Sequence, residues 1–254
     1  MAKPPPAALP GKANAQNTPA NKDGYRQTPK ERNQRGQVLG NKGARTRQAI
    51  LDATREMIFE GPFRNISAVE IAKRAGVSVA TLYTYFEDVA AVIVALAEIV
   101  AEQTPKVSRF LEVPWTGQPA LGNIIEMMTA LVDHNLANYP IIRLRNHLAD
   151  EGEERLAKLR SHTAQPVIDL LSHQIVTHGQ MNELEMPARV SENARLTAGL
   201  LLGMIDRLTV LLMQTPYRTH MFTKSDYIDS AARIVLAAVT ATSANTTPYS
   251  QADE

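Results

Sequence analysis

The stretch ISAVEIAKRAGVSVATLYTYF, residues 66–86, carries the signals of two short helices joined by a tight turn. Ser67 can cap the first helix through its hydroxyl, and Glu70, three residues later, can reach back to the Ser67 amide. Gly76 supplies the left-handed residue that ends this helix, because a residue without a Cβ adopts that conformation at little cost. Ser78 then caps the second helix. The spacing of these residues predicts a helix-turn-helix.

The second helix of this stretch has a slim, polar outward face. At about 100° per residue, Leu82 lies at the centre of its buried side. The residues on or beside the opposite side are Ala80, Thr81, Tyr83 and Thr84. The major groove of DNA admits a helix, small methyl groups can touch the thymine methyl, and hydroxyls can bond bases or phosphates. This face therefore indicates DNA binding, and a helical hairpin inside an ordinary core is the alternative interpretation.

Residues from about 46 to 86 resemble the DNA-binding domain of the tetracycline-repressor (TetR) family. The likeness lies in AILDAT at residues 49–54 and in IAKRAGVSVATLYTYF at residues 71–86. It implies a DNA-binding head and a divergent helical body with a pocket for a small molecule. It also implies that the segments 79–81 and 83–85 face DNA, with the tyrosines largely on phosphates. Two positions depart from the family's pattern, since Ala80 stands where glycine is common and Val89 where a phosphate-binding basic residue is usual.

Basic charge is concentrated at the amino-terminal end of the chain. The first 50 residues contain ten Lys or Arg and two acidic residues, so the net charge of +1 hides about +8 there and about −7 elsewhere. Arg45 and Arg47, beside the head, are predicted to contact phosphates. With the two capping serines included, the predicted DNA-binding residues are Arg45, Arg47, Ser67, Ser78, Val79, Ala80, Thr81, Tyr83, Thr84 and Tyr85.

Residues 1–43 are rich in Pro, Asn, Gln, Gly and Lys and have almost no apolar periodicity. They cannot bury enough surface to offset the entropy of ordering, which predicts a disordered basic tail. This tail either aids solubility only or forms a flexible arm that contacts DNA through Arg26, Lys30, Arg32 and Arg35.

The composition excludes several classes of protein. The 254 residues are 44% apolar, enough for a sizeable core, and the absence of cysteine excludes disulfides and thiol chemistry. No uninterrupted apolar run approaches the roughly 18 residues of a membrane span, and Lys3 is not followed by the apolar region of a secretory signal. We therefore expect a cytoplasmic protein that does not contact membranes.

The rest of the chain reads as helices. Apolar residues at three- and four-residue spacing predict helices at about 46–60, 120–138, 140–149, 155–177, 188–214 and 225–242, and Asp88 can cap another. Pro166 interrupts the helix at about 155–177, and a kink there would open room between packed helices. No segment reads as a strand. We therefore expect an all-α fold with a head at residues 44–90, a body at 91–242 and a frayed tail at 243–254.

The body carries no recognisable catalytic motif. It lacks a P-loop, a GxGxxG after a strand and a GxSxG, and its six histidines are scattered, so we expect no enzyme activity, metal or cofactor. Its middle helices instead mix adaptable apolar side chains with a few polar ones, which is typical of small-molecule sites. The predicted ligand-binding residues are Trp115, Met127, Met128, Leu131, Asn135, Tyr139, Arg143 and His147. The alternative is that these residues simply pack the helices together.

The helix predicted at 188–214 is apolar nearly all round between Ala198 and Leu212, so more than one of its sides must be buried. A second copy of the chain is the simplest cover, because Gly199 and Gly203, four residues apart, allow close backbone approach; burial within one chain is the alternative. We expect a homodimer through this helix and the one at 225–242.

These patterns together predict a one-component transcription regulator, most simply a repressor. Two heads would bind a near-palindromic DNA operator, and a small, largely apolar effector would release them. An architectural DNA-binding protein without an effector and a helical enzyme with an added helix-turn-helix are the alternatives.

Overall fold

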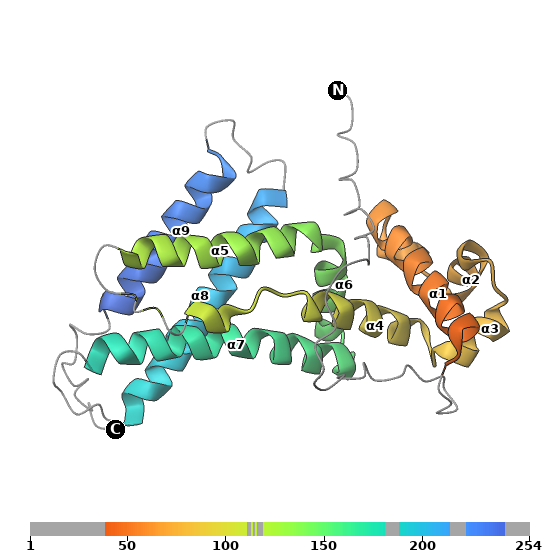
Figure 1. Cartoon of the computed structure of the whole chain (residues 1–254), viewed down its shortest axis with the longest axis horizontal. Coiled ribbons are helices and arrows are strands. Elements are labelled where there is room, and N and C mark those ends of the chain that lie inside the picture. Colours follow the sequence, from red (N-terminus) through yellow and green to blue (C-terminus); the bar gives the residue numbers. More distant parts are fainter. Residues whose placement is uncertain are drawn as a thin grey trace, which may run out of the picture.

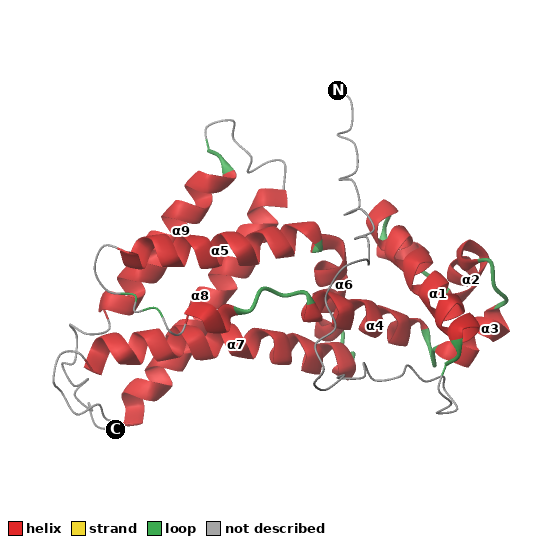
Figure 2. Ribbon diagram, viewed as in Figure 1, coloured by secondary structure: helices red, strands yellow, loops and turns green. Residues whose placement is uncertain are grey.

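Helices make up the regular structure of the computed structural model, which describes residues 39–110, 113, 115, 119–180, 188–213 and 222–241. No strand occurs in these residues, in agreement with the all-α prediction (Figure 2). The tails predicted at 1–43 and 243–254 lie outside the described residues, except that residues 39–43 include the start of the first helix.

The head is a three-helix unit at one end of the molecule (Figure 1). It consists of α1 (Asn41–Glu60), η1 (Phe63–Asn65), α2 (Ala68–Ala75) and α3 (Val79–Tyr85). Its largest fully buried side chains are Ile50, Leu51, Ile71 and Leu82. The first helix begins five residues earlier than the predicted start at about 46, because no side chain caps it at Gly40 and the sequence therefore carries no start signal there.

The helix α4 (Val89–Glu102) connects the head to the body, as predicted from Asp88. The Asp88 carboxylate accepts a hydrogen bond from the Ala91 amide at 2.6 Å, which caps the helix. Apolar side chains such as Val92 and Leu96 bury α4 against both α1 and α6 (Tyr139–Asp150). The head core continues into α6 through Ile141 and Leu144, so the two parts of the chain share buried surface.

The body is a bundle of long helices. It consists of η2 (Val107–Phe110), α5 (Pro119–Ala137), α7 (Glu154–Gln180), α8 (Ala188–Met213) and α9 (Lys224–Ala241), beside α6. The most extensive packing joins α7 to α8, and α5 lies against α9 (Figure 1). The predicted interruption at Pro166 does not occur, since α7 is assigned as one helix of 27 residues with Pro166 inside it.

One stretch of α8 is apolar enough to cross a membrane by length and composition. This stretch is Asn193–Met213, with a mean hydropathy of 1.7. Only 28% of its apolar part is buried in the single chain, and Leu196 and Leu200 are 68% and 78% exposed. The search of the sequence for an uninterrupted apolar run did not find this stretch, because Arg195, Asp206 and Arg207 divide its apolar residues.

Candidate functional site

The turn between α2 and α3 has the geometry that the sequence predicts. The Ser67 hydroxyl oxygen accepts a hydrogen bond from the Glu70 amide at 3.3 Å. Gly76 has φ 68°, and its amide bonds to Lys73 O while the Val77 amide bonds to Ala72 O at 2.9 Å. This pair of bonds satisfies the last carbonyls of α2 and turns the chain directly into α3.

The helix α3 is fixed at its first turn and through its buried side. The Ser78 hydroxyl oxygen accepts a hydrogen bond from the Thr81 amide at 3.0 Å, and the two hydroxyls are 2.8 Å apart. Leu82 is fully buried in the head core. The cap sets where α3 begins and Leu82 sets its rotation, so the position of the opposite face follows from both.

The opposite face of α3 is open to solvent at the outer end of the head (Figure 1). Ala80, Tyr83 and Thr84 are exposed, and the Thr84 hydroxyl donates to Ala80 O at 3.1 Å. That bond directs the Thr84 hydroxyl proton to the backbone. The methyl group of this exposed side chain therefore remains available for contacts outside the helix. The Tyr83 phenol has no hydrogen-bond partner among the described residues, so it is free to bond an external acceptor. Val79, Thr81 and Tyr85 are partly buried.

The predicted basic contacts differ in environment. Arg45 is exposed on α1, whereas Arg47 is partly buried with its guanidinium carbon 5.1 Å from the centroid of the Phe86 ring. Arg47 therefore stacks on the residue that follows α3. Ser67 is exposed, and its capping bond uses an oxygen lone pair while the O–H remains able to donate to a phosphate. Contact of these residues with DNA stays a prediction.

Residues 50–96 match the family described as "Bacterial regulatory proteins, tetR family". This chain carries a TetR-family DNA-binding domain. The matched segment contains most of α1, the helix-turn-helix and the first half of α4. No curated protein matches the chain in sequence.

Solved structures with a similar fold cover most of the chain. A tetR-family transcriptional regulator from Streptomyces coelicolor is 18% identical, with a TM-score of 0.54 over 81% of this chain and 84% of that one. A transcriptional regulator from Rhodococcus sp. Rha1 is 20% identical, with a TM-score of 0.51 over 78% and 95%. A TetR family transcription regulator from Marinobacter aquaeolei VT8 is 20% identical, with a TM-score of 0.50 over 79% and 98%. The family match therefore covers the DNA-binding domain at residues 50–96, and the likeness to these solved structures extends to the fold of most of the chain.

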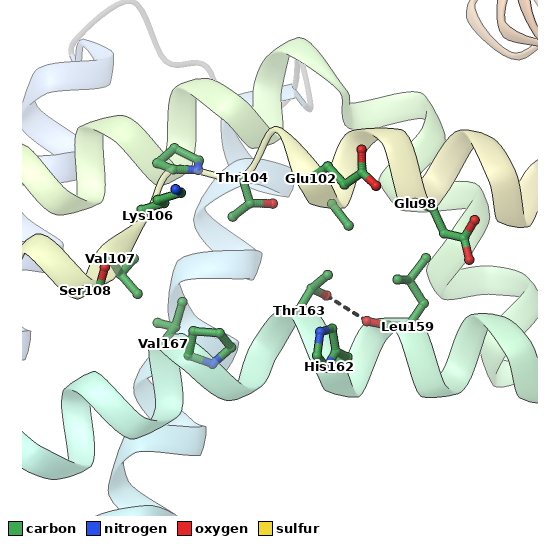
Figure 3. Close-up of a pocket in the computed structure, with 13 residues that line it drawn as sticks. Glu98, Glu102, Thr104, Lys106, Val107, Ser108, Leu159, His162, Thr163 and Val167 are labelled. Carbon is green, nitrogen blue, oxygen red and sulfur yellow. Dashed lines mark hydrogen bonds between the residues drawn. The ribbon is translucent and has the colours of Figure 1, made fainter. Parts of the chain in front are cut away.

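The body contains a cavity between α4 and α7, here called the outer chamber. Its volume is about 540 Å³, and it extends along the end of α4, the start of η2 and the middle of α7. Figure 3 shows Glu98 and Glu102 on the α4 side and Leu159 and His162 on the α7 side. Pro166 also lines it, so the proline stands at the cavity although α7 is not interrupted there.

A smaller hollow of about 80 Å³, here called the inner chamber, adjoins the first. The two share Ala101, Thr104, Thr163 and Val167. The polar and charged groups specific to the inner chamber are His134, Asn135, Arg145, Arg160 and Asp206. They come from four helices, α5 to α8, and the remaining lining is mostly aliphatic.

Burial and neighbouring charges shift the pKa values of His134 and Asp206 in the inner chamber. Burial lowers the pKa of His134, and the Arg145 guanidinium lowers it further. Burial raises the pKa of Asp206, against the opposing effects of Arg145 and Arg160. Asp206 nevertheless keeps an exposed surface in the single chain, so it lies at the edge of the hollow. The Thr104 hydroxyl and His134 Nε2 are 3.3 Å apart, which links the end of α4 to α5.

The structure distributes the predicted ligand-binding residues over three environments. Trp115, Met127 and Met128 are fully buried in the body core. Leu131 and Asn135 line the inner chamber, and Tyr139 is partly buried outside both chambers.

The last two predicted ligand-binding residues lie on the surface of α6. The guanidinium carbon of Arg143 is 5.7 Å from the Phe63 ring centroid, and His147 Nε2 is 3.4 Å from Glu151 Oε1. Neither residue lines a chamber. The structure therefore brings together only Leu131 and Asn135 of the predicted set.

Several chamber residues escaped the sequence prediction. Arg145 stands in the apolar stripe of α6, four residues after Ile141 and three before Leu148, and Asp206 interrupts the apolar run of α8. A charge inside an otherwise buried helical face was the signal that could have marked both. Among the described residues, no group of three or more His, Cys, Asp or Glu side chains could hold a metal ion.

An ion-pair cluster joins the body to the start of α4. Arg155, at the start of α7, bonds Glu153 at 2.7 Å and reaches the Asp88 carboxylate at 3.1 Å. Asp88 is also the cap of α4, two residues after Phe86, which follows α3. A shift of α7 that reaches Arg155 would therefore act on the junction between the head and α4.

Proposed function

We propose that this TetR-family chain is a repressor that binds a near-palindromic operator through the exposed face of α3. The observation that carries the proposal is the outward presentation of Ala80, Tyr83 and Thr84 on a helix whose start and rotation are fixed. No Arg, Lys, Asn or Gln occurs between Ser78 and Phe86, so the helix lacks the bidentate readers of guanine and adenine. Recognition would depend on thymine methyls, phosphate contacts and DNA shape.

The proposed assembly is a homodimer through α8 and α9. Leu196 and Leu200 on α8 and Ile234 on α9 are 68%, 78% and 53% exposed, which is unfavourable for large apolar side chains in water. A Cβ added at Gly199 or Gly203 would meet nothing within 4 Å in the single chain, so the space above these glycines is available to a partner. A second copy would cover this surface and place two heads side by side.

The proposed effector binds in the chambers of the body. The helix α4 lines both chambers and is capped at Asp88 beside the head, so a molecule there contacts the helix that carries the head. Release requires that the effector bind the conformation unable to engage the operator more tightly than the competent one. A cytoplasmic location, where the operator is found, follows from this proposal.

The experiment that tests the function is a gel-shift and footprinting titration of the purified chain on DNA upstream of its own and adjacent genes. A repressor of the proposed kind protects one near-palindromic segment, and metabolite extracts reduce the protection. Protection that no extract changes would favour an architectural DNA-binding protein. Turnover of a metabolite without sequence-specific protection would favour an enzyme with an added helix-turn-helix.

A further inference from the structure

Arg145 differs from the other paired arginines of the body in the partners of its guanidinium. Its Nε and Nη2 donate to Asn146 Oδ1 at 3.1 and 3.0 Å, and its Nη1 donates to Thr163 Oγ1 at 3.4 Å. All three bonds go to neutral acceptors. No carboxylate of the described residues lies within 4.0 Å of this guanidinium, whereas Arg155 and Arg160 each contact at least one.

No other described group of the inner chamber forms an ion pair with Arg145 within 4.0 Å, and only the Asp206 carboxylate attracts its charge, from a longer distance. Arg160 Nη1 bonds Asp150 Oδ1 at 2.6 Å, so its charge is paired outside the chamber. Burial and Arg145 lower the pKa of His134, which favours its neutral form. Asp206 lines the same hollow and attracts Arg145 electrostatically, but the two side chains form no ion pair within 4.0 Å. A partly buried cation with only neutral partners is the arrangement that an anionic ligand would complete.

The outer chamber offers the complementary apolar space. The part of it that adjoins the inner chamber is bounded by Ala101 and Val167, and Pro105 and Leu159 lie farther along. Glu98 and Glu102 also line this chamber, and they would repel an anionic group left there. An amphipathic anion would therefore place its charge inward at Arg145 and its apolar part outward.

The fork of a guanidinium fits both carboxylate and phosphate. The inner chamber is only about 80 Å³, and the carboxyl group of Asp206 forms part of its wall. Both features disfavour a dianionic phosphate relative to a smaller, singly charged group. Carboxylate is the anion that the chamber favours.

We propose that the effector of this chain is an amphipathic monocarboxylate whose carboxylate binds Arg145 in the inner chamber and whose apolar part fills the outer chamber. The inference rests on the proposed function, because it names the chemistry of the ligand that releases the operator. Arg145 is a binding residue in this scheme, and Thr163, which contacts it, is a positioning residue.

The test is calorimetric titration of the full-length protein with three carboxylates of different apolar shape: decanoate, 4-phenylbutanoate and cyclohexylacetate. Each is compared with its primary alcohol, and decanoate also with decyl phosphate. At least one carboxylate should bind about tenfold or more tightly than its alcohol. Arg145→Met should reduce binding of that carboxylate to the level of its alcohol and leave binding of the alcohol unchanged.

The control is Lys158→Met, which removes one cation from an exposed position of α7 outside both chambers and should change neither affinity. Arg145→Lys keeps the charge without the fork and should fall between wild type and Arg145→Met, so it also serves if the methionine variant does not fold. The inference is overturned if no carboxylate binds, if carboxylate and alcohol bind equally, if decyl phosphate binds more tightly than decanoate, or if both substitutions leave the preference intact.

Failure of the inference and failure of the proposed function give different results. If the carboxylates do not bind but a metabolite extract still releases the operator, the repressor function stands and the ligand class is wrong. If neither the carboxylates nor any extract releases bound DNA, the effector-controlled function itself is wrong.

Discussion

The head and the body differ in how far apart in the sequence their interacting residues lie. The residues that fix α3 are close together in the sequence, whereas those that line the inner chamber are far apart. In the head, the bonds that fix the recognition helix join residues three to five positions apart, as between Ser78 and Thr81 or Ala72 and Val77. In the body, the inner chamber assembles side chains from residue 100 to residue 206. Local chemistry therefore defines the proposed DNA-facing surface, whereas the proposed ligand-binding surface depends on how distant helices pack.

The largest effect should come from the body, far from DNA. Leu200 is 78% exposed on α8, and its neighbour Leu201 is 6% exposed in the body core. Leu200→Glu should dissociate a folded dimer and abolish operator binding, because the charge would be buried without a partner at a cost of about 3 to 5 kcal/mol. Leu201→Glu should instead unfold the body.

Sedimentation, circular dichroism and gel shifts of the two variants separate these outcomes. A Leu200→Glu protein that remains dimeric and binds the operator would mean that the dimer uses another surface. Equal loss of structure in both variants would mean that α8 is covered on both sides within one chain.

The second-largest effect should come from a substitution in the head. Tyr83 is 48% exposed, and removal of its hydroxyl in Tyr83→Phe should weaken operator binding by about 1.5 to 3 kcal/mol, the worth of a hydrogen bond to a charged group. The free energy of unfolding should change by less than about 0.5 kcal/mol, since the side chain is at the surface. A gel-shift titration and a denaturant melt measure the two quantities. Unchanged affinity would place the phosphate contacts elsewhere on the head.

A smaller effect should appear when the turn itself is altered. Gly76 has φ 68° with nothing within 4 Å of an added Cβ, so Gly76→Ala should lower stability by about 1 to 2 kcal/mol through backbone strain alone. Gly61→Ala is the matched control, because Gly61 also has open space but an extended backbone with φ −156°. Thermal unfolding of both variants measures the difference, and equal melting temperatures would contradict a strained turn.

The smallest effect concerns pH and the inner chamber. Burial, and then Arg145, lowers the pKa of His134 in the folded chain, and Arg160 and Asp206 line the same hollow from α7 and α8. Because the unfolded chain binds this proton more readily, the contribution of His134 to stability is present above its ordinary pKa of about 6.5 and is lost as pH falls toward the folded value.

Replacement of His134 by Asn removes this dependence. Between pH 7.5 and pH 5.5, the melting temperature of the wild type should fall further than that of His134→Asn. The other five histidines contribute equally to both proteins. Parallel pH profiles would show that His134 is as accessible to protons in the folded chain as in the unfolded one.

Several helix ends in and beside the head were predictable because capping residues occupy them. Ser67, Gly76, Ser78 and Asp88 perform the roles that their positions indicated. The start of α1 at Asn41 was not predictable, since Gly40 offers no capping side chain. The path of α7 through Pro166 was missed for a different reason, because packing against α8 along its length outweighs the lost hydrogen bond at one residue.

The body's helices were also placed well by periodicity, but its chambers were not. Methionines such as Met127 and Met128 are typical of ligand sites, yet both side chains are buried in the core. Arg145 was passed over because its neighbours in the chamber, Thr163 and Asp206, are 18 and 61 residues away in the sequence. Helical spacing says which residues share a face and not which faces meet.

The central claim is that two copies of this chain read DNA with α3 at a spacing set by α8 and α9. The most direct measurement is selection of binding sites from random duplex DNA by the full-length protein, followed by sequencing. The account predicts an inverted repeat whose half-site centres lie about 34 to 36 Å apart, or a multiple of that distance, with thymines dominating the contacted positions. Recovery of single half-sites, of no enriched sequence, or of half-sites dominated by guanine would contradict it.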